Sequence, residues 1–315
     1  MENETNCIQY SIVIPVYNSE KTLVELVNRI LTTMQTLSND FEILFIDDCS
    51  KDRSWGVLKD LRKTDFRIKI FHLAKNSGQH NAILCGLNYA SGKYIIILDD
   101  DLQNPPEEIP KLIKKIGEGY FVVYGKYIDK KHGTIKKGMG SVYHALLHHL
   151  LDVPKDLYLS NFIIMTSEVQ KNILRIKCSF TFINALISKV TPHEKVANID
   201  VIHESRTFGR SNYTSLKHMK LLLNLIINYS SFPLVSIGIL GAVTSILSIA
   251  YGIFLIVNKL INPNFSMEGW LSLMVAVTLL GGATLMSIAV VGEYIRRILT
   301  EITYSQPYLI GEMEL

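Results

Sequence analysis

Three consecutive aspartates, Asp99, Asp100 and Asp101, are the residues of this sequence best suited to chemistry. Adjacent carboxylates repel one another, so a fold keeps three of them together only where a cation or several hydrogen-bond donors neutralise them. In an extended segment Asp99 and Asp101 point to one side and Asp100 points to the other. Carboxylate oxygens are the ligands that Mg²⁺ and Mn²⁺ prefer, and these ions often bridge to substrate phosphates. The spacing therefore predicts a metal site with Asp99 and Asp101 as ligands.

The residues next to this pair extend the predicted site. Two positions further on, Gln103 supplies either a neutral oxygen ligand or an anchor for a metal-bound water. Asp100, which points to the other side, is expected to face the substrate instead of the metal. The metal would act as a Lewis acid on a departing nucleoside diphosphate. The alternative is a solvated acidic turn that caps the following helix. The buried strand that leads into the aspartates favours the metal.

The elements that position these residues follow from the N-terminal half, where apolar runs alternate with helical periodicity as in an α/β sheet. Three predicted strands end in polar residues, at Tyr17-Asn18, Asp47-Asp48 and Asp99–Asp101. Ligands of open α/β sheets bind outside the carboxyl ends of the strands, so these residues predict one shared site. We predict strands over residues 11–16, 41–46, 68–73, 94–98 and 120–124, and helices over 20–34, from about 52, over 80–90 and over 105–116.

The carboxylates Asp47 and Asp48 are placed to accept hydrogen bonds from a nucleobase or from ribose hydroxyls, and capping of the next helix is the alternative. No G-x-G-x-x-G follows the first strand, where Pro15-Val16-Tyr17-Asn18 stands instead, and this argues against a dinucleotide-dependent dehydrogenase. No G-x-x-x-x-G-K-[ST] motif occurs, which argues against a P-loop enzyme. A net charge of +3, without a basic run interleaved with aromatics, predicts no nucleic-acid partner.

The apolar composition is concentrated near the C-terminus. Residues 232–257 and 270–292 carry no charge, and each stretch exceeds the ~20 residues that cross a bilayer core. A buried helix of a soluble protein is the alternative for each. The connector over 258–269 contains Asn262-Pro263-Asn264, a turn signal, so the two stretches predict a helical hairpin in the lipid bilayer.

Flanking charges predict the orientation of this hairpin. Lys217 and Lys220 precede it and Arg296-Arg297 follow its second stretch, so both termini are expected in the cytoplasm. The first residues lack the apolar run of a signal peptide, and the four cysteines show no C-x-x-C pair, which favours a reducing compartment. The expected domains are a cytoplasmic catalytic domain over 1–214, an interfacial amphipathic helix over 215–230, the hairpin over 231–294 and a cytoplasmic tail over 295–315. A soluble amphipathic helix packed on the catalytic domain is the alternative for 215–230.

Several segments together resemble family 2 glycosyltransferases of the GT-A fold. The resemblance is closer to polyprenyl-phosphate glycosyltransferases, such as dolichyl-phosphate mannose synthases and undecaprenyl-phosphate 4-deoxy-4-formamido-L-arabinose transferases. It extends from about residue 11 to 310, and it implies a Rossmann-like nucleotide-sugar-binding domain. The segments are SIVIPVYNSE, EILFIDDCSKD, NSGQHNAILCGLNYASGKYIIILDDDLQNPPEEIPKL, ESRTFGRSNYTSLKH and GEYIRRILTE.

The resemblance assigns roles to individual residues. Basic side chains hold the donor phosphates in the mannose synthases, where Arg stands at the positions of Lys126 and Lys137; lysine keeps the charge but loses bidentate geometry. Arg206, Arg210 and Ser211 match a loop that meets the acceptor phosphate, although solvated surface charges are the alternative. The implied catalytic residues are Asp99, Asp101 and Arg206; the implied metal ligands, for Mg²⁺ or Mn²⁺, are Asp99, Asp101 and Gln103; and the expected donor-binding residues are Pro15, Tyr17, Asn18, Asp47, Asp48, Asp100, Lys126 and Lys137.

The implied reaction is metal-dependent, inverting transfer of a sugar from a nucleotide-sugar to a polyprenyl phosphate, with undecaprenyl phosphate as the expected acceptor. It implies an integral protein of a bacterial inner or plasma membrane acting at the cytoplasmic face. Some relatives carry Gly-Asp-Phe-Arg, with the Asp proposed as a base, where this chain has Ser160-Asn161-Phe162-Ile163. A phosphate monoester with a second pKa near ~6 is already largely dianionic and needs no base, so the difference favours a lipid phosphate acceptor. Relatives form oligomers in some cases, which leaves a homo-oligomer open.

Three rival functions remain open at this point. A transferase acting on a glycan or lipid hydroxyl would need a base. A polysaccharide synthase would carry Gln-x-x-Arg-Trp, but neither Trp55 nor Trp270 follows an arginine. A degenerate nucleotide-sugar-binding scaffold is favoured by Asn161, by the lysines in place of arginine, and by Ser19 at a position where relatives commonly carry Glu.

Overall fold

The computed structural model describes residues 8–128, 153–154, 156–178, 181–204, 232–261, 269–302 and 307–315. The chain forms two compact units, one made of Met1–Asn212 with Tyr304–Leu315 and the other of Tyr213–Thr303. Several predictions lie outside the described residues: the roles of Lys137, Arg206, Arg210 and Ser211, the interfacial helix over 215–230 and the turn at Asn262-Pro263-Asn264.

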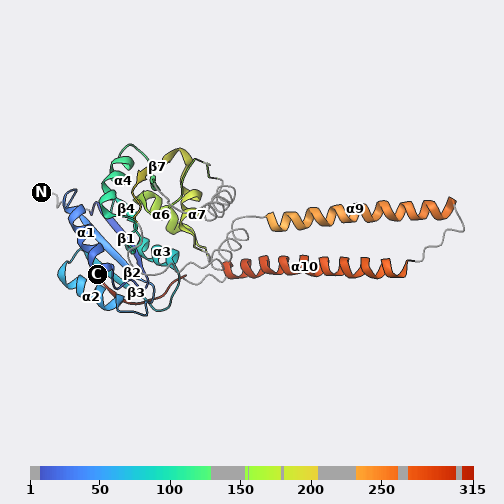
Figure 1. Cartoon of the computed structure of the whole chain (residues 1–315), viewed down its shortest axis with the longest axis horizontal. Coiled ribbons are helices and arrows are strands. Elements are labelled where there is room, and N and C mark those ends of the chain that lie inside the picture. The colour runs from blue at the N-terminus through green and yellow to red at the C-terminus, as the bar shows by residue number, and fades with distance from the viewer. Residues whose placement is uncertain are drawn as a thin grey trace. The chain divides into compact units, whose positions relative to one another are not determined.

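The first unit is built on one mixed sheet (Figure 1). Its strand order is β7-β5-β6-β4-β1-β2-β3-β8, with β1 to β4 mutually parallel and β6 and β8 antiparallel to their neighbours. The predicted α/β class is therefore confirmed. The strands are β1 Tyr10–Val16, β2 Phe41–Asp47, β3 Ile68–Leu73, β4 Tyr94–Ile97, β5 Val122–Tyr127, β6 Ile163–Thr166, β7 Val196–Val201 and β8 Ile310–Glu314.

The central strands are apolar on both faces because helices cover both sides of a parallel sheet. All residues of β1 and β2 are buried, which accounts for their continuous apolar runs. Pro15 fits within β1 because the ladder to β4 ends at Val13 paired with Ile97, so a strand residue without an N–H is tolerated beyond that point. Strand β1 thus continues past β4 and delivers the residues that follow Val16 to the carboxyl edge of the sheet.

Two groups of helices flank the sheet. On one face α1, α2 and α4 share a core with alternate residues of β1 and β2, and on the other α3 packs on β1 and β2 and contacts α6 and α7. The helices are α1 Leu23–Gln35, α2 Ser54–Thr64, α3 Gln79–Tyr89, the 3₁₀ turn η1 Pro106–Glu108, α4 Ile109–Ile116, α6 Ser167–Arg175, α7 Ile183–Val190 and the 3₁₀ turn η2 His193–Lys195.

Helix α1 shows how the pattern of the sequence produces this layer. Its buried apolar residues recur at helical spacing, as Leu23, Leu26, Val27, Ile30 and Met34. Each such side chain contributes about 1.5–3 kcal/mol when fully buried. The helix begins three residues later than predicted. The amides of the preceding segment are bound elsewhere, since the N–H of Ser19 donates to Ser54 Oγ and that of Glu20 donates to Asp52 Oδ2.

Helix α3 lies close to the opposite face of the sheet because Gly86 has no side chain. A Cβ at this position would lie 2.7 Å from Ile46 Cδ1 and closer still to Val13 Cγ1. The close approach anchors α3 over β1 and β2, and the N-terminal end of α3 follows Gly78, whose φ of 90° suits glycine.

The second unit contains the two long helices α9, Phe232–Ile261, and α10, Trp270–Ile302. Both are long and apolar enough to cross a membrane, over Leu234–Phe254 and Leu273–Thr300, with mean hydropathies of 2.0 and 2.2. Large apolar side chains stand exposed along them, such as Ile246 at 65% and Leu285 at 70%. Apolar surface of this extent is stable in lipid rather than in water, so the pair fits a transmembrane hairpin.

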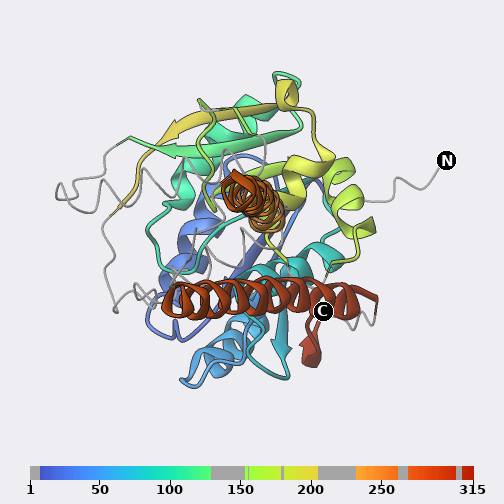
Figure 2. The same cartoon turned by 90° about the vertical axis from the view of Figure 1, so that its right-hand side faces the viewer.

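After α10 the chain returns to the sheet of the first unit. Strand β8 pairs antiparallel with β3, and Figure 2 shows the red C-terminal strand beside the cyan strand of the sheet. The backbone N–H of Ala74 also donates to Leu309 O at 2.8 Å. Residues 295–315 were expected only as a cytoplasmic tail, and their sequence does not predict strand β8.

Candidate functional site

Three loops follow the carboxyl ends of β1, β2 and β4, and each contains one residue in the left-handed region. These are Asn18 (φ 55°), Cys49 (φ 57°) and Leu102 (φ 60°), the positive-φ residues other than glycine in the described part of the chain. Such conformations are unfavourable for side-chain-bearing residues and cluster at functional sites, where the surrounding structure enforces them. The three polar segments that were predicted to meet at one edge of the sheet are therefore the same segments that contain the strained backbone residues.

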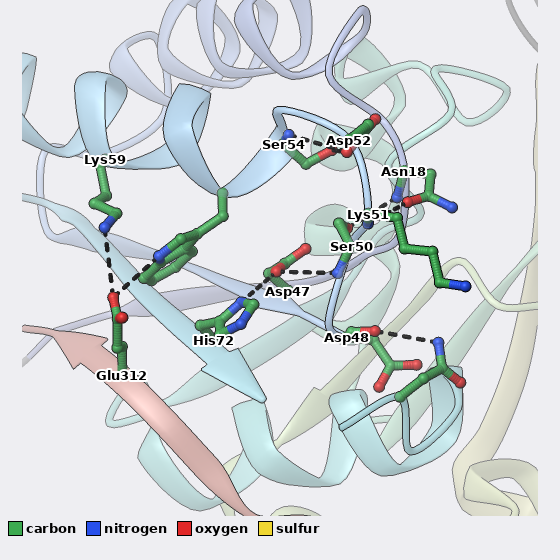
Figure 3. Close-up of polar contacts among 12 residues, drawn as sticks. Asn18, Asp47, Asp48, Ser50, Lys51, Asp52, Ser54, Lys59, His72 and Glu312 are labelled. Carbon is green, nitrogen blue, oxygen red and sulfur yellow. Dashed lines mark hydrogen bonds and ion pairs between the residues drawn. The ribbon is translucent and has the colours of Figure 1, made fainter. Parts of the chain in front are cut away.

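The loops after β1 and β2 are fastened directly to each other. Asn18 is bonded in both directions, since its N–H donates to Ser50 Oγ at 2.9 Å and its Oδ1 accepts from the N–H of Lys51 at 2.8 Å (Figure 3). The N–H of Asp48 donates to Val16 O at 2.8 Å. The two loops therefore form one rigid platform at the ends of adjacent strands.

Asp100 connects the loop after β4 to the same platform. Its Oδ2 accepts hydrogen bonds from the N–H of Tyr17 at 3.1 Å and from Ser19 Oγ at 2.5 Å, while its carbonyl accepts from Thr22 Oγ1 at 2.7 Å. Burial raises the pKa of this carboxyl to about 6, although the two donors oppose the shift. Asp100 thus holds the loop after β1, a contact that its expected role toward the donor sugar does not include.

Asp48 meets the N-terminal end of α3. Its carboxylate is 3% exposed and accepts the N–H groups of Ser77 at 2.6 Å and Gly78 at 2.8 Å. Burial raises the pKa of Asp48, the two backbone donors lower it, and the neighbouring charge of Asp47 raises it further. An acceptor of this kind at a loop end can receive a hydrogen bond from a nucleobase N–H.

Asp47 instead contacts His72, which lies opposite it on the neighbouring strand β3. It is 0% exposed, and its Oδ2 is 2.6 Å from His72 Nδ1 and accepts the N–H of Ser50 at 3.3 Å. The two neighbouring aspartates, to which sequence analysis gave one shared role, therefore have different partners. His72 on β3 was not among the predicted site residues.

Asp99 and Asp101 have different partners, and both act electrostatically on Tyr127 at the end of β5. Asp99 Oδ1 accepts from Gln79 Nε2 at 2.7 Å, and Asp101 Oδ1 accepts from the N–H of Gln103 at 3.1 Å. Burial raises the pKa of the Tyr127 phenol, and the charges of both aspartates raise it further. Negative charge therefore accumulates at this point of the site, which is the electrostatic condition that a cation would relieve.

The chemistry of these donors fits a hard divalent cation. In the described ranges, no group of three or more His, Cys, Asp and Glu side chains is arranged to hold a metal by itself. Asp99, Asp101 and the amide of Gln103 offer oxygen ligands only, and so few protein ligands leave positions for water and substrate phosphates. That division is usual for Mg²⁺ and Mn²⁺ and differs from a closed structural site.

The segment after β7 is attached to the same loop. Gln103 and Glu204 are bonded twice, since the N–H of Glu204 donates to Gln103 O at 2.9 Å and Gln103 Nε2 donates to Glu204 O at 3.4 Å. Arg29 of α1 adds an ion pair to Glu107 at 2.8 Å and another to Glu204 at 3.5 Å. The end of the described segment after β7, at Glu204, is therefore fastened to the loop that contains Asp101.

Several residues near the site were not predicted, because tertiary contacts determine their positions. Strand β5 continues to Tyr127, three residues past its predicted end, because β7 pairs with it as far as Val201. The ring of His203 lies 4.2 Å from that of Tyr127, and Asn104 is 2% exposed. Lys126 is exposed on β5 next to Tyr127, and successive strand side chains alternate, so the two point to opposite faces. The phosphate contact of Lys126 stays a prediction.

Comparisons with known proteins agree with this geometry. Residues 11–188 match the glycosyl transferase family 2. The uncharacterized glycosyltransferase YkcC of Bacillus subtilis is 34% identical over 96% of this chain and 93% of its own length. An undecaprenyl-phosphate 4-deoxy-4-formamido-L-arabinose transferase of Klebsiella pneumoniae is 32% identical over 95% of this chain and 92% of its own.

Solved structures show the same fold. The glucosyl-3-phosphoglycerate synthase of Mycobacterium tuberculosis, in complex with Mn²⁺, UDP-glucose and phosphoglyceric acid, superposes with a TM-score of 0.52 at 16% identity, covering 69% of this chain and 78% of that one. Its complex with phosphoglyceric acid alone gives 0.54 at 17% identity, covering 70% and 80%. The predicted GT-A fold is confirmed. With a family match over more than half of its length and relatives similar along nearly all of it, this chain belongs to glycosyl transferase family 2 and is a glycosyltransferase.

Proposed function

We propose that this glycosyltransferase transfers a sugar from a nucleotide-sugar to a polyprenyl phosphate, with undecaprenyl phosphate as acceptor, at the cytoplasmic face of a membrane. The observation that carries the proposal is the double hydrogen bond between Gln103 and Glu204. It joins the aspartate loop to the segment that contains Arg206. Arg206 follows Glu204 by two positions in the sequence, and the resemblance assigns it to the acceptor phosphate. Arginine at this point suits a phosphate better than a sugar hydroxyl.

The names of similar proteins support both substrates. The Klebsiella pneumoniae relative is named for transfer to undecaprenyl phosphate, and it is similar along nearly its whole length, including the two apolar stretches. The Mycobacterium tuberculosis synthase holds UDP-glucose and Mn²⁺ on the same fold. We therefore assign two substrates to this one chain, a nucleotide-sugar as donor and a lipid-linked phosphate as acceptor.

The side chains at the carboxyl edge divide the work on the donor. The platform formed by the loops after β1 and β2 receives the nucleoside, with Asp48 as an acceptor for its base. Asp99 and Asp101, with Gln103, would hold Mg²⁺ or Mn²⁺ beside the diphosphate. When bound, this ion supplies positive charge against the departing nucleoside diphosphate.

The transfer exchanges one bond at the anomeric carbon. A phosphate oxygen of the acceptor forms the new C–O bond as the bond to the donor diphosphate breaks, and the nucleoside diphosphate leaves with the electron pair. Attack from the opposite face inverts the anomeric configuration. The dianionic acceptor needs orientation and screening rather than deprotonation, which agrees with Asn161 standing where some relatives carry a carboxylate.

The connectivity of the chain supports the expected topology. The first unit contains residues on both sides of α9 and α10 in the sequence, because β8 belongs to its sheet. If both helices cross the bilayer, the two ends of the hairpin emerge on the same side. Lys217, Lys220 and Arg296-Arg297 on that side favour the cytoplasm.

The proposal is tested with the purified full-length protein, a panel of nucleotide-sugars, and two acceptors that differ in one group, undecaprenyl phosphate and undecaprenol. Mass spectrometry of the lipid product should show sugar transfer to the phosphate only, with Mg²⁺ or Mn²⁺ and not with EDTA. Asp101→Ala should lower turnover at least about 100-fold, whereas Asp60→Ala on the exposed face of α2 should not.

Each other result points to a rival function. Transfer to undecaprenol would favour a hydroxyl acceptor and refute the phosphate. Nucleotide binding without consumption of any donor would favour a scaffold. Full activity of the Asp101→Ala variant would remove the metal assignment.

A further inference from the structure

The C-terminal strand reaches the back of the nucleoside platform. In the pairing of β3 with β8, Glu312 lies opposite His72. Glu312 Oε2 accepts a hydrogen bond from Trp55 Nε1 at 3.1 Å and lies 3.4 Å from Lys59 Nζ. The hydrogen bond from Trp55 and the charge of Lys59 lower the pKa of Glu312, which is therefore ionised at neutral pH. Strand β8 is thus attached to helix α2 as well as to β3.

Trp55 and His72 carry this attachment toward Asp47. Their ring centroids are 5.0 Å apart with an interplanar angle of 35°, so the indole limits the orientations open to the imidazole. The Nδ1 atom of the same imidazole lies 2.6 Å from Asp47 Oδ2. Figure 3 shows the sequence of contacts, with Glu312 and Lys59 on one side, His72 in the middle, and Asp47 and Ser50 on the other.

Asp47 has few other means of support. It is fully buried, its Oδ1 has no partner in the described part of the chain, and its Oδ2 is shared by His72 and the N–H of Ser50. A buried carboxylate that loses a donor bears a large desolvation cost, so the contact with His72 matters for its position. Ser50 Oγ in turn accepts the N–H of Asn18, which connects Asp47 to both loops of the platform.

We propose that strand β8 is a working part of the donor site, in which Glu312 fixes Trp55, Trp55 orients His72, and His72 positions Asp47 and the two loops that receive the nucleoside. His72 is a positioning residue, because it acts through Asp47. The inference rests on the proposed use of a nucleotide-sugar. Residues that follow the second long helix would thus support the nucleoside-binding loops, which lie near the N-terminal end of the sequence.

The strand offers a matched control. Glu312 and Glu314 are both exposed glutamates on the same face of β8, but Glu314 lies opposite Ile70 rather than His72. Glu312→Ala and Glu314→Ala remove the same charge and the same atoms. Glu312→Gln keeps an oxygen that can accept from Trp55 and should retain near-normal binding.

A second set of variants tests the order of the contacts. Trp55→Phe keeps an aromatic ring near His72 but removes the N–H that donates to Glu312. If the two residues act in one series, Trp55→Phe combined with Glu312→Ala should weaken binding no more than either change alone. Trp55→Phe combined with Glu314→Ala should match Trp55→Phe alone.

The measurement is the dissociation constant of UDP and of GDP for the full-length protein with Mn²⁺, together with KM for the donor and kcat once a donor is found. We expect Glu312→Ala to raise the dissociation constant of the bound nucleotide and the donor KM about three- to tenfold, with kcat at saturation unchanged. General destabilisation would instead lower the active fraction, and so kcat, at constant KM. Glu314→Ala should leave all three values unchanged.

The inference and the proposed function fail in different ways. If the wild-type protein binds neither nucleotide and consumes no nucleotide-sugar, both are refuted. If the wild type binds a nucleotide but Glu312→Ala and Trp55→Phe bind it as well as Glu314→Ala does, only the role of β8 is overturned. Loss of kcat alone, or strict additivity of the double variant, would also overturn it.

Discussion

Replacing Asp100 by asparagine should stabilise the metal-free protein at neutral pH. Burial raises the pKa of this carboxyl from 3.8 to about 6 in the folded protein. Asparagine is neutral at every pH, and its Oδ1 can accept the same hydrogen bonds from the N–H of Tyr17 and from Ser19 Oγ. The variant therefore removes the cost of the buried charge while the contacts remain.

The magnitude and its sign follow from the shift. A shift of about two pKa units corresponds to about 3 kcal/mol. Below pH 4 the carboxyl is protonated in both states and contributes no difference. As the pH rises from 4 through 6, the unfolded chain gives up this proton more readily than the folded protein does. The free energy of unfolding of the wild type therefore falls by about this amount. The Asp100→Asn variant should thus match the wild type near pH 4 and exceed it above pH 7.

Trp55 provides a suitable signal, because the sequence has two tryptophans and Trp270→Phe leaves only the one in the first unit. Thermal unfolding followed by its fluorescence, in detergent with EDTA, should give a Tm higher by roughly 6–12 °C at pH 8, since about 1 kcal/mol corresponds to 2–4 °C for a unit of this size. Asp60→Asn, at an exposed residue whose pKa Lys63 lowers, should give no such gain. An equal or lower Tm for Asp100→Asn at pH 8, or a difference independent of pH, would refute the reasoning.

Two other predictions concern packing and reactivity. Gly86→Ala should destabilise the first unit by about 1–3 kcal/mol, because its Cβ would press on Val13 and Ile46. Gly56→Ala, with open space around it in α2, should instead stabilise the unit by about 0.5–1 kcal/mol. Urea unfolding measures both changes, and equal effects of the two variants would contradict this explanation. Burial raises the pKa of the Cys85 thiol to about 12, so iodoacetamide at pH 8 should label Cys85 only after unfolding, as peptide mass spectrometry would show. Rapid labelling of native Cys85 would disprove its burial.

The strands that carry the site were predictable because they are buried on both faces. The runs SIVIPV, FEILFI and YIIIL are apolar apart from Ser11 and Glu42, and each is followed by polar residues that mark the carboxyl edge of the sheet. The candidate metal ligands followed from residue type alone. These signals are local, so one sequence contains them in full.

Other parts were not predicted because their signals are not local. Strand β6 has four residues, Ile163–Thr166, too few to show a period, and β8 reads Ile-Gly-Glu-Met-Glu with little apolar character. The difference between Asp47 and Asp48 depends on His72 from β3 and on the N-terminal end of α3, which only the folded chain brings together. The sequence shows that both residues are acidic, but not that Asp47 contacts His72 while Asp48 contacts the N-terminal end of α3.

The pairing of β8 with β3 has a consequence for biosynthesis. Trp55 and Glu312 are 257 positions apart, so both long helices must be synthesised before this contact can form. Until then β3 presents an unpaired edge, the kind of surface through which nascent chains associate wrongly. The first unit thus completes its sheet only after both long helices have been synthesised. A chain that ended before Ile310 would lack this strand and would leave the edge of β3 unpaired.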